Sequence, residues 1–274
     1  MKKLALLFVV FISFVSYGQI GPYASFHVGY AFPVASDTIG TKIVATSNGD
    51  LIRTNIYSTY GTGINATLKA GFKHTQNFGV ELGTNYLYGL KKTTKDFSGV
   101  NSSTLEKTQT SQLRIMPGIV LETSNAALTI YSRLGAVIPL MGKTFTESKN
   151  VITTGSSTNE TITKRETNYG LSLGYYGAAG VSLKIKEKLK VFAEVELVTL
   201  KIKKKSTILT QETVNGSDVL DTYTTSQKET EYKDSYNSAD NTDTSRPRSV
   251  RTSKVNFNGA SINIGIRFNF LDLK

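Results

Sequence analysis

The sequence predicts an all-β protein, an eight-stranded antiparallel up-and-down transmembrane β-barrel with short periplasmic turns and long extracellular loops. Eight segments of roughly ten residues alternate between apolar and polar side chains, which is the period of a strand. The connections between these segments alternate between short and long. Among the 274 residues there is no Cys, which excludes disulfide scaffolds and thiolate metal sites.

The eight segments and their connections set the predicted topology. The alternating segments are residues 24–32, 64–72, 78–88, 113–121, 128–140, 171–185, 191–197 and 260–270. Short turns are expected at 74–77, 123–126 and 186–189, and long loops at about 33–60, 91–111, 141–168 and 203–254. Long loops without secondary structure are unusual in a compact soluble domain, whereas an outer-membrane barrel has them on its extracellular side. This asymmetry places both termini in the periplasm.

The polar face of each segment decides which side of the barrel wall points to lipid. A soluble eight-stranded barrel has the same alternation, so alternation alone leaves the orientation open. One polar face carries Gly63, Asn65, Thr67, Lys69 and Gly71. Glycine weakens a water-exposed strand but suits the crowded lumen of a narrow barrel. We therefore expect the apolar face to contact lipid.

The first 18 residues are predicted to be a signal peptide, followed by one barrel domain over residues 19–274. Lys2 and Lys3 precede an apolar run at positions 4–15, and Ser16 and Gly18 are small residues before a cleavage site at Gln19. The run is shorter than the roughly 20 residues that a membrane-spanning helix needs. The protein is expected in the outer membrane of a Gram-negative bacterium.

Charged residues on the inward face predict a filled lumen. They are Lys69, Arg114, Arg133, Lys184 and Arg267 against Glu81, Glu122, Glu194 and Glu196. Charges that are evenly matched in a narrow space should pair. If Phe72 lies opposite Phe78, Lys69 lies opposite Glu81. An alternative makes Glu194 and Glu196 a catalytic acid and base or a proton path. We favour counter-ions, and we assign no catalytic, cofactor or metal site.

A basic rim is expected above the barrel. It consists of Lys91, Lys92, Lys95, Lys201, Lys203, Lys204 and Lys205. These side chains suit either plain solvation or binding of lipopolysaccharide phosphates. The last loop contains 18 Ser or Thr in residues 206–253. Such a composition is expected to lack a single stable structure.

The opening and closing strands resemble those of the small outer-membrane barrel family of the OmpA transmembrane domain and OmpX. The resemblance lies in residues 23–30, YASFHVGY, and residues 264–270, IGIRFNF. It implies an outer-membrane location and recognition of the Phe-ended terminal strand by the barrel-assembly machinery.

We expect a non-enzymatic protein with a structural or surface-interaction role that its extracellular loops carry. Its expected partners are outer-membrane lipid and an unidentified surface ligand, with no nucleic acid and no cofactor. The alternatives are a narrow passive pore for ions or small solutes and, third, a lipid-modifying outer-membrane enzyme.

Overall fold

The computed structural model describes residues 21–46, 48–123 and 127–270, and its fold is all-β. The predicted signal peptide and most of the predicted turn at 123–126 lie outside the described residues. Within the described part of the chain, no helix combines the length and the apolar character needed to cross a bilayer.

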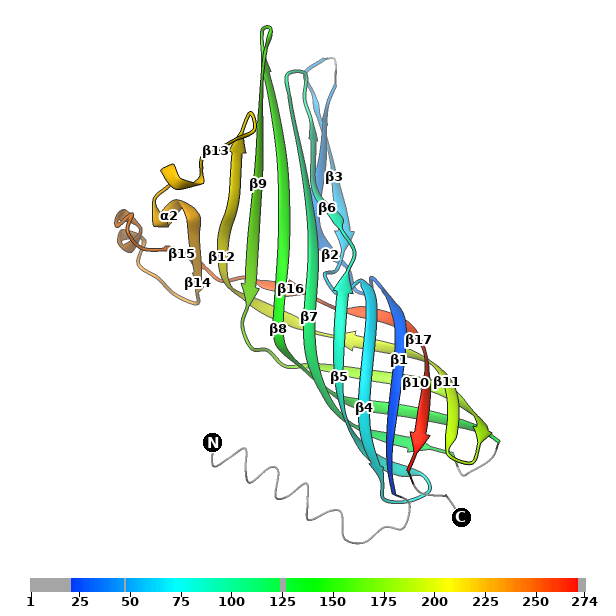
Figure 1. Cartoon of the computed structure of the whole chain (residues 1–274). Coiled ribbons are helices and arrows are strands. Elements are labelled where there is room, and N and C mark those ends of the chain that lie inside the picture. Colours follow the sequence, from blue (N-terminus) through cyan, green and yellow to red (C-terminus); the bar gives the residue numbers. More distant parts are fainter. Residues whose placement is uncertain (1–20, 47, 124–126, 271–274) are drawn as a thin grey trace.

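Eight strands close into a ring (Figure 1). In ring order they are β1 (Gly21–Phe32), β4 (Gly63–Lys73), β5 (Phe78–Gly89), β7 (Ser102–Glu122), β8 (Leu128–Thr154), β10 (Gly174–Lys186), β11 (Leu189–Thr199) and β17 (Gly259–Asn269). Each strand pairs antiparallel with the next, and β17 pairs with β1. The eight predicted segments correspond to these eight strands.

The prediction of eight strands in total is wrong, because the sheet has 17. The additional strands lie in the segments predicted as loops: β2 (Asp37–Ala45), β3 (Leu51–Ser58), β6 (Lys92–Ser98), β9 (Ser157–Tyr169), β12 (Lys201–Val214), β13 (Ser217–Asp218), β14 (Glu229–Lys233), β15 (Arg248–Arg251) and β16 (Lys254–Asn256). Short helices are η2 (Leu220–Thr222), α2 (Thr225–Lys228) and η3 (Ser238–Thr242). Residues 206–253 therefore contain paired strands where a segment without stable structure was expected.

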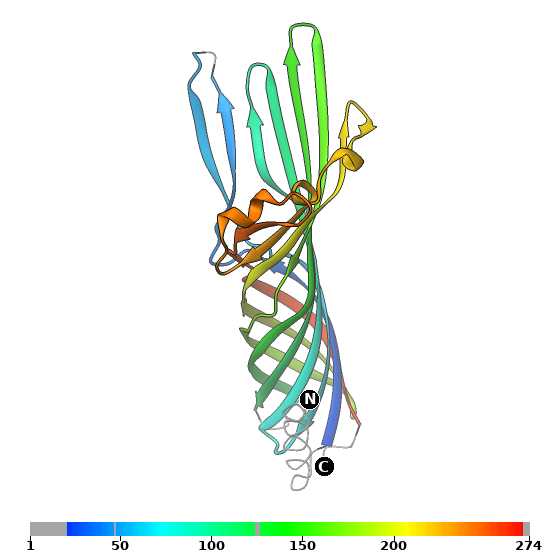
Figure 2. The same cartoon turned by 90° about the vertical axis from the view of Figure 1, so that its left-hand side faces the viewer.

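These additional strands extend the barrel wall into a protruding sheet. It consists of β2, β3, β6, β9, β12, β14 and β15 together with the ends of β7 and β8 that run beyond the ring. Figure 2 shows its hairpins rising from one end of the ring. We call this the sheet end, and the end with the short connections the turn end.

Threonine side chains explain why polar segments form strands here. Thr108 lies between Thr94 and Thr146, with hydroxyl oxygens 3.1 and 3.3 Å apart, and the Thr110 and Thr144 hydroxyls are 3.0 Å apart. Thr is β-branched, and cross-strand Thr pairs stabilise a sheet. These segments are too polar to form a compact core. They become ordered because they extend, or pair with, strands that begin in the ring.

The faces of the ring alternate as expected. Phe26 and Leu68 are 46% and 60% exposed on the outside, whereas His27 and Lys69 are fully buried inside. We call the exposed apolar side chains of the ring strands the apolar belt; its members include Phe26, Val28, Leu68, Leu82, Tyr86, Tyr88, Leu134, Met141, Val181, Val195, Ile264, Ile266 and Phe268. The ring therefore has an apolar outside and a polar inside.

The predicted register of the first hairpin is wrong by two residues. Phe72 pairs with Val80, and Lys69 pairs with Gly83. The reason is that Phe78, the first residue of β5, closes the turn: its carbonyl oxygen accepts hydrogen bonds from the backbone N–H groups of His74 and Thr75, so it has no partner in β4. A shift of two residues leaves every side chain on its predicted face.

Candidate functional site

The candidate site is the charged lumen of the ring. Its buried cations are Lys69, Lys73, Arg114, Arg133, Lys190 and Arg267, and its buried carboxylates are Glu81, Glu122, Glu194 and Glu196. Lys184 was predicted here, but it is exposed near the turn end, opposite Lys190. Lys73 and Lys190 were missed because their strands extend one residue beyond the predicted bounds. Four carboxylates therefore face six cations.

Glu81 of β5 is bound by four side chains from four strands. Lys69 Nζ lies 3.1 Å and Arg133 Nε 3.3 Å from its Oε1 atom. The hydroxyl groups of Tyr23 and Tyr176 donate to the carboxylate over 3.0 and 3.3 Å. Although Lys69 and Glu81 are not directly opposite in the ladder, their side chains meet diagonally. This carboxylate links β4, β8, β1 and β10 through the middle of the lumen.

Glu194 of β11 forms a second junction. It accepts hydrogen bonds from Arg133 Nη1, from the Tyr131 hydroxyl at 2.9 Å and from Asn263 Nδ2 at 3.3 Å. Arg133 therefore bridges Glu81 and Glu194. Its guanidinium carbon lies 4.6 Å from the ring centre of Tyr131 and 5.2 Å from that of Phe192. Cation–π contacts of this kind are strongest where water is excluded.

A third junction lies toward the turn end. Glu122 accepts hydrogen bonds from Lys73 Nζ and Arg267 Nη1, and its partners come from β4 and β17. The Arg267 guanidinium carbon also lies 4.5 Å from the ring centre of Tyr23. The three junctions form a continuous polar network, which is how buried charges avoid a large desolvation cost.

Unlike the charges of the three junctions, Glu196 and Arg114 form no ion pair within 4 Å among the described residues. In the described part of the chain, Glu196 Oε2 and Arg114 Nη2 are buried without a hydrogen-bond partner, although Gln112 accepts a hydrogen bond from Arg114 Nε. Both residues line a cavity of about 10 Å³, together with Asn65 and Asn85. A space of that size and polarity suits one water molecule.

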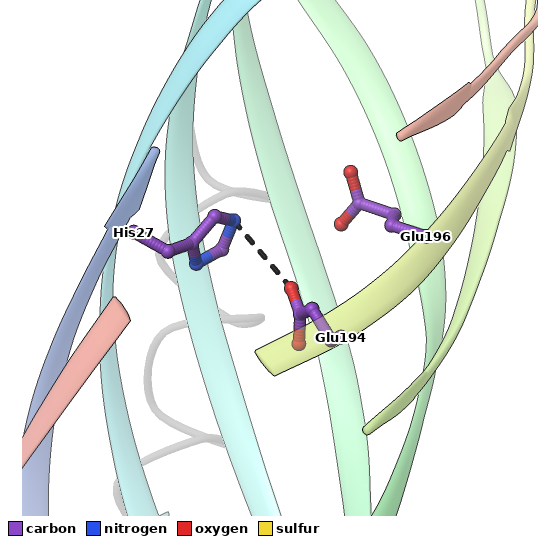
Figure 3. Close-up of side chains that lie close together, drawn as sticks. All are labelled: His27, Glu194 and Glu196. Atoms are coloured by element: carbon purple, nitrogen blue, oxygen red, sulfur yellow. Dashed lines mark ion pairs between the residues drawn. The ribbon is translucent and has the colours of Figure 1, made fainter. Parts of the chain in front are cut away.

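The side chains of His27, Glu194 and Glu196 lie close together inside the ring (Figure 3), and Glu196 also lines this cavity. His27 Nε2 lies 3.6 Å from Glu194 Oε1. One nitrogen or oxygen atom from each of the three side chains lies within 4.8 Å of the other two. The three side chains could reach a small cation, but Arg133 already occupies Glu194 and lumen cations outnumber carboxylates. The donor set therefore fits a divalent metal poorly. As a catalytic acid and base, Glu194 and Glu196 would need room for a substrate, and this cavity offers none.

An apolar cluster closes the lumen toward the sheet end. It contains Met116, Val137, Tyr176, Val198, Leu200, Ile202, Val255 and Phe257, with Tyr60 and Tyr169 packed against it. Leu200, Ile202 and Phe257 are at most 1% exposed. This cluster lies between the charged part of the lumen and the protruding sheet. Sequence reasoning missed it because Leu200, Ile202 and Phe257 lie outside the predicted strands.

Some lysines of the predicted basic rim contact other residues, and the others are exposed to solvent. Lys203 Nζ lies 2.6 Å from Asp234, Lys204 Nζ lies 5.7 Å from the ring centre of Tyr232, and Lys92 donates to the Thr59 carbonyl oxygen. Lys91, Lys95, Lys201 and Lys205 are exposed. Burial lowers the pKa of Lys92 to about 8. The rim thus combines structural lysines with solvated ones.

No protein-family model and no curated protein matches this chain. Among solved structures, neisserial surface protein A has a TM-score of 0.36 and 10% identity, over 91% of this chain and 97% of that one. The attachment invasion locus protein Ail of Yersinia pestis has a TM-score of 0.32 and 13% identity, over 91% of this chain and 100% of that one. The role of the lumen is consequently inferred from this chain's own residues.

Proposed function

We propose that this chain is an integral, non-enzymatic outer-membrane protein that fixes a surface-exposed β-sheet to a filled barrel. The observation that carries the proposal is the closed ring with an apolar outside and a charged, hydrogen-bonded inside. In water this arrangement would expose an apolar surface on every side, whereas in a bilayer the same surface contacts lipid. The barrel-assembly machinery would insert such a chain.

The apolar belt supports the orientation. Tyr86 and Tyr88 are 48% and 49% exposed toward the sheet end, and Phe78 and Phe268 are 37% and 45% exposed toward the turn end. Aromatic side chains at both edges of an apolar band are typical of membrane interfaces. The turn end then faces the periplasm, together with the ends of the described chain, and the protruding sheet faces the cell exterior.

The lumen argues against the pore and the enzyme. Ion pairs link β4, β5, β7, β8, β11 and β17 across the interior, and the apolar cluster closes the sheet end. A continuous water path would have to break this network. Glu194 is a counter-ion of Arg133, whereas Glu196 fills the lumen beside Arg114, and the cavity of about 10 Å³ there is too small for a substrate.

The protruding sheet supplies a surface for interaction. Its edge strand β3 pairs with β2 alone among the described strands, and Ile52 and Tyr57 are 58% and 63% exposed on its two faces. An exposed edge strand presents unpaired backbone donors and acceptors that a partner's strand can use. Lys91, Lys95, Lys201 and Lys205 below it are available for anionic outer-membrane lipid, lipopolysaccharide among them.

Location and conductance test the proposal together. The mature protein should stay in the outer-membrane fraction, migrate faster unheated than boiled on an SDS gel, and give no steady conductance in planar bilayers. A protease added to intact cells should cut within residues 37–58. Recovery from the soluble periplasm would contradict the location, and steady single-channel conductance would favour the pore.

A further inference from the structure

A second cavity opens on the protruding sheet, where β7, β8, β9 and β12 lie side by side. Its volume is about 190 Å³, far larger than the lumen cavity. Four cationic residues line it, Lys91, Lys107, Lys164 and Arg165, together with Glu147 and Phe145. Lys107, Glu147 and Lys164 share one face of the sheet, whereas Arg165 is paired with Thr146, so its side chain starts on the other face. All six side chains are exposed to solvent.

The ladder explains why positive charge accumulates there. Glu147 of β8 lies directly opposite Lys107 of β7 on one side and Lys164 of β9 on the other. Neighbouring strands are about 4.8 Å apart, so both lysines start within roughly 5 Å of the same glutamate backbone. One carboxylate cannot neutralise both of these lysines and Lys91 as well. The pocket therefore keeps a positive excess.

Other lysines of the same sheet are neutralised by carboxylates, in contrast to those of the pocket. Lys143 Nζ lies 2.8 Å from Glu166, and Lys149 Nζ lies 2.7 Å from Glu160. Across the described residues, the four pocket cations have no carboxylate within 4 Å. Cations that are clustered without counter-charges bind anions from solution or from a surface.

The height of the pocket above the apolar belt indicates where the anion comes from. Lys91 follows Tyr88 by three residues, and Phe145 follows Met141, which is 67% exposed, by four. At about 3.3 Å per residue these distances are roughly 10 and 13 Å along the strands. A strand tilt of about 45° reduces them to roughly 7 and 9 Å along the bilayer normal, at the outer boundary of a headgroup layer about 5–7 Å thick. The 47% exposed ring of Phe145 offers an apolar surface beside the cations.

We propose that this pocket binds a phosphate monoester of a phosphorylated glycolipid in the outer leaflet, with Lys107 and Lys164 holding the phosphate and Phe145 packing against its sugar. The inference rests on the proposed outer-membrane location. It goes further in naming a built pocket and a ligand group, and only Lys91 belongs to the predicted rim.

The test measures lipid binding to the full mature protein in detergent by native mass spectrometry. The probes are bisphosphorylated lipid A, the same lipid after enzymatic dephosphorylation, and inorganic phosphate as a competitor. The Lys107→Gln/Lys164→Gln variant should bind bisphosphorylated lipid A about 30-fold more weakly, because it loses two near-surface cations that each contribute about a factor of five. The Glu147→Gln variant should bind it several-fold more tightly, a gain that misfolding cannot produce.

The matched control is Arg53→Gln/Arg248→Gln, which removes the same charge from exposed positions of the protruding sheet outside both the pocket and the basic rim. It should change binding less than twofold. Equal loss in the two double variants would overturn the pocket in favour of diffuse attraction. Equal binding of the dephosphorylated lipid, or displacement by millimolar inorganic phosphate, would overturn the glycolipid. Because these measurements use purified protein, they are independent of the fractionation experiment that tests the location.

Discussion

The Glu81→Gln substitution is the sharpest test of the lumen network. The carboxylate holds Lys69 and Arg133 at 3.1 and 3.3 Å, and all three side chains are fully buried. Arg133 keeps Glu194 after the substitution, but Lys69 has no second carboxylate within ion-pair distance in the described part of the chain. Orphaning a buried cation costs about 3–5 kcal/mol. We expect the free energy of unfolding to fall by that amount.

Urea unfolding of the refolded protein in detergent micelles, followed by circular dichroism and by gel mobility, measures this loss. The control is Glu166→Gln, whose partner Lys143 is 2.8 Å away and half exposed, so its cost should be about 0–1 kcal/mol. Adding Lys69→Met to Glu81→Gln should restore much of the stability, because the orphaned charge is removed. A cost for Glu81→Gln no greater than that of the control would refute the reasoning.

Three further outcomes are expected. Gly71→Ala should lower the free energy of unfolding in urea by about 1–3 kcal/mol, because the new Cβ would lie 2.2 Å from the Tyr23 ring. Gly177→Ala should cost less in the same experiment, because its Cβ would lie 3.4 Å from the nearest atom, in Leu134. Burial lowers the pKa of Lys92 from 10.5 to about 8, so the unfolded chain binds this proton more tightly than the folded chain. The free energy of unfolding should therefore rise between pH 8 and 10.5. Urea titrations across this pH range should show the rise, and Lys92→Met should abolish it. Replacing residues 37–58 with a short turn should leave heat-modifiable gel mobility intact, since β2 and β3 lie outside the ring; a variant that no longer folds would show that the ring depends on them.

The ring could be predicted from sequence because its strands follow one physical rule, an apolar residue at every second position. That rule also placed Lys69, Glu81, Arg133 and Glu194 inside. It could not give the register of the first hairpin, which depends on backbone hydrogen bonds within the turn at His74 and Thr75. The alternation of side chains along a strand therefore predicts which residues face the lumen, but it does not predict which residue of the next strand lies opposite each of them.

The protruding sheet could not be predicted for a different reason. Its strands are rich in Thr and Ser, a composition shared with disordered segments. They become ordered because β7 and β8, with 21 and 27 residues, continue out of the ring and offer edges for pairing. Lys184 lies on the ladder row of the buried Lys190, at the last position before the register shift near the turn end, and is exposed there; alternation along the strand alone does not show where the lumen ends.

The pairing of β1 with β17 has a consequence for how the chain acquires its fold. Tyr23 lies beside Asn269, so the contact that closes the ring joins residues from opposite ends of the sequence. Closing so long a loop is entropically costly and slow, whereas the hairpins of the protruding sheet join strands that are neighbours in the sequence. Until β17 is in place, β1 and β11 each keep an unpaired edge. The wall is therefore expected to close last, and a chain that lacks β17 would keep the backbone edges of β1 and β11 exposed.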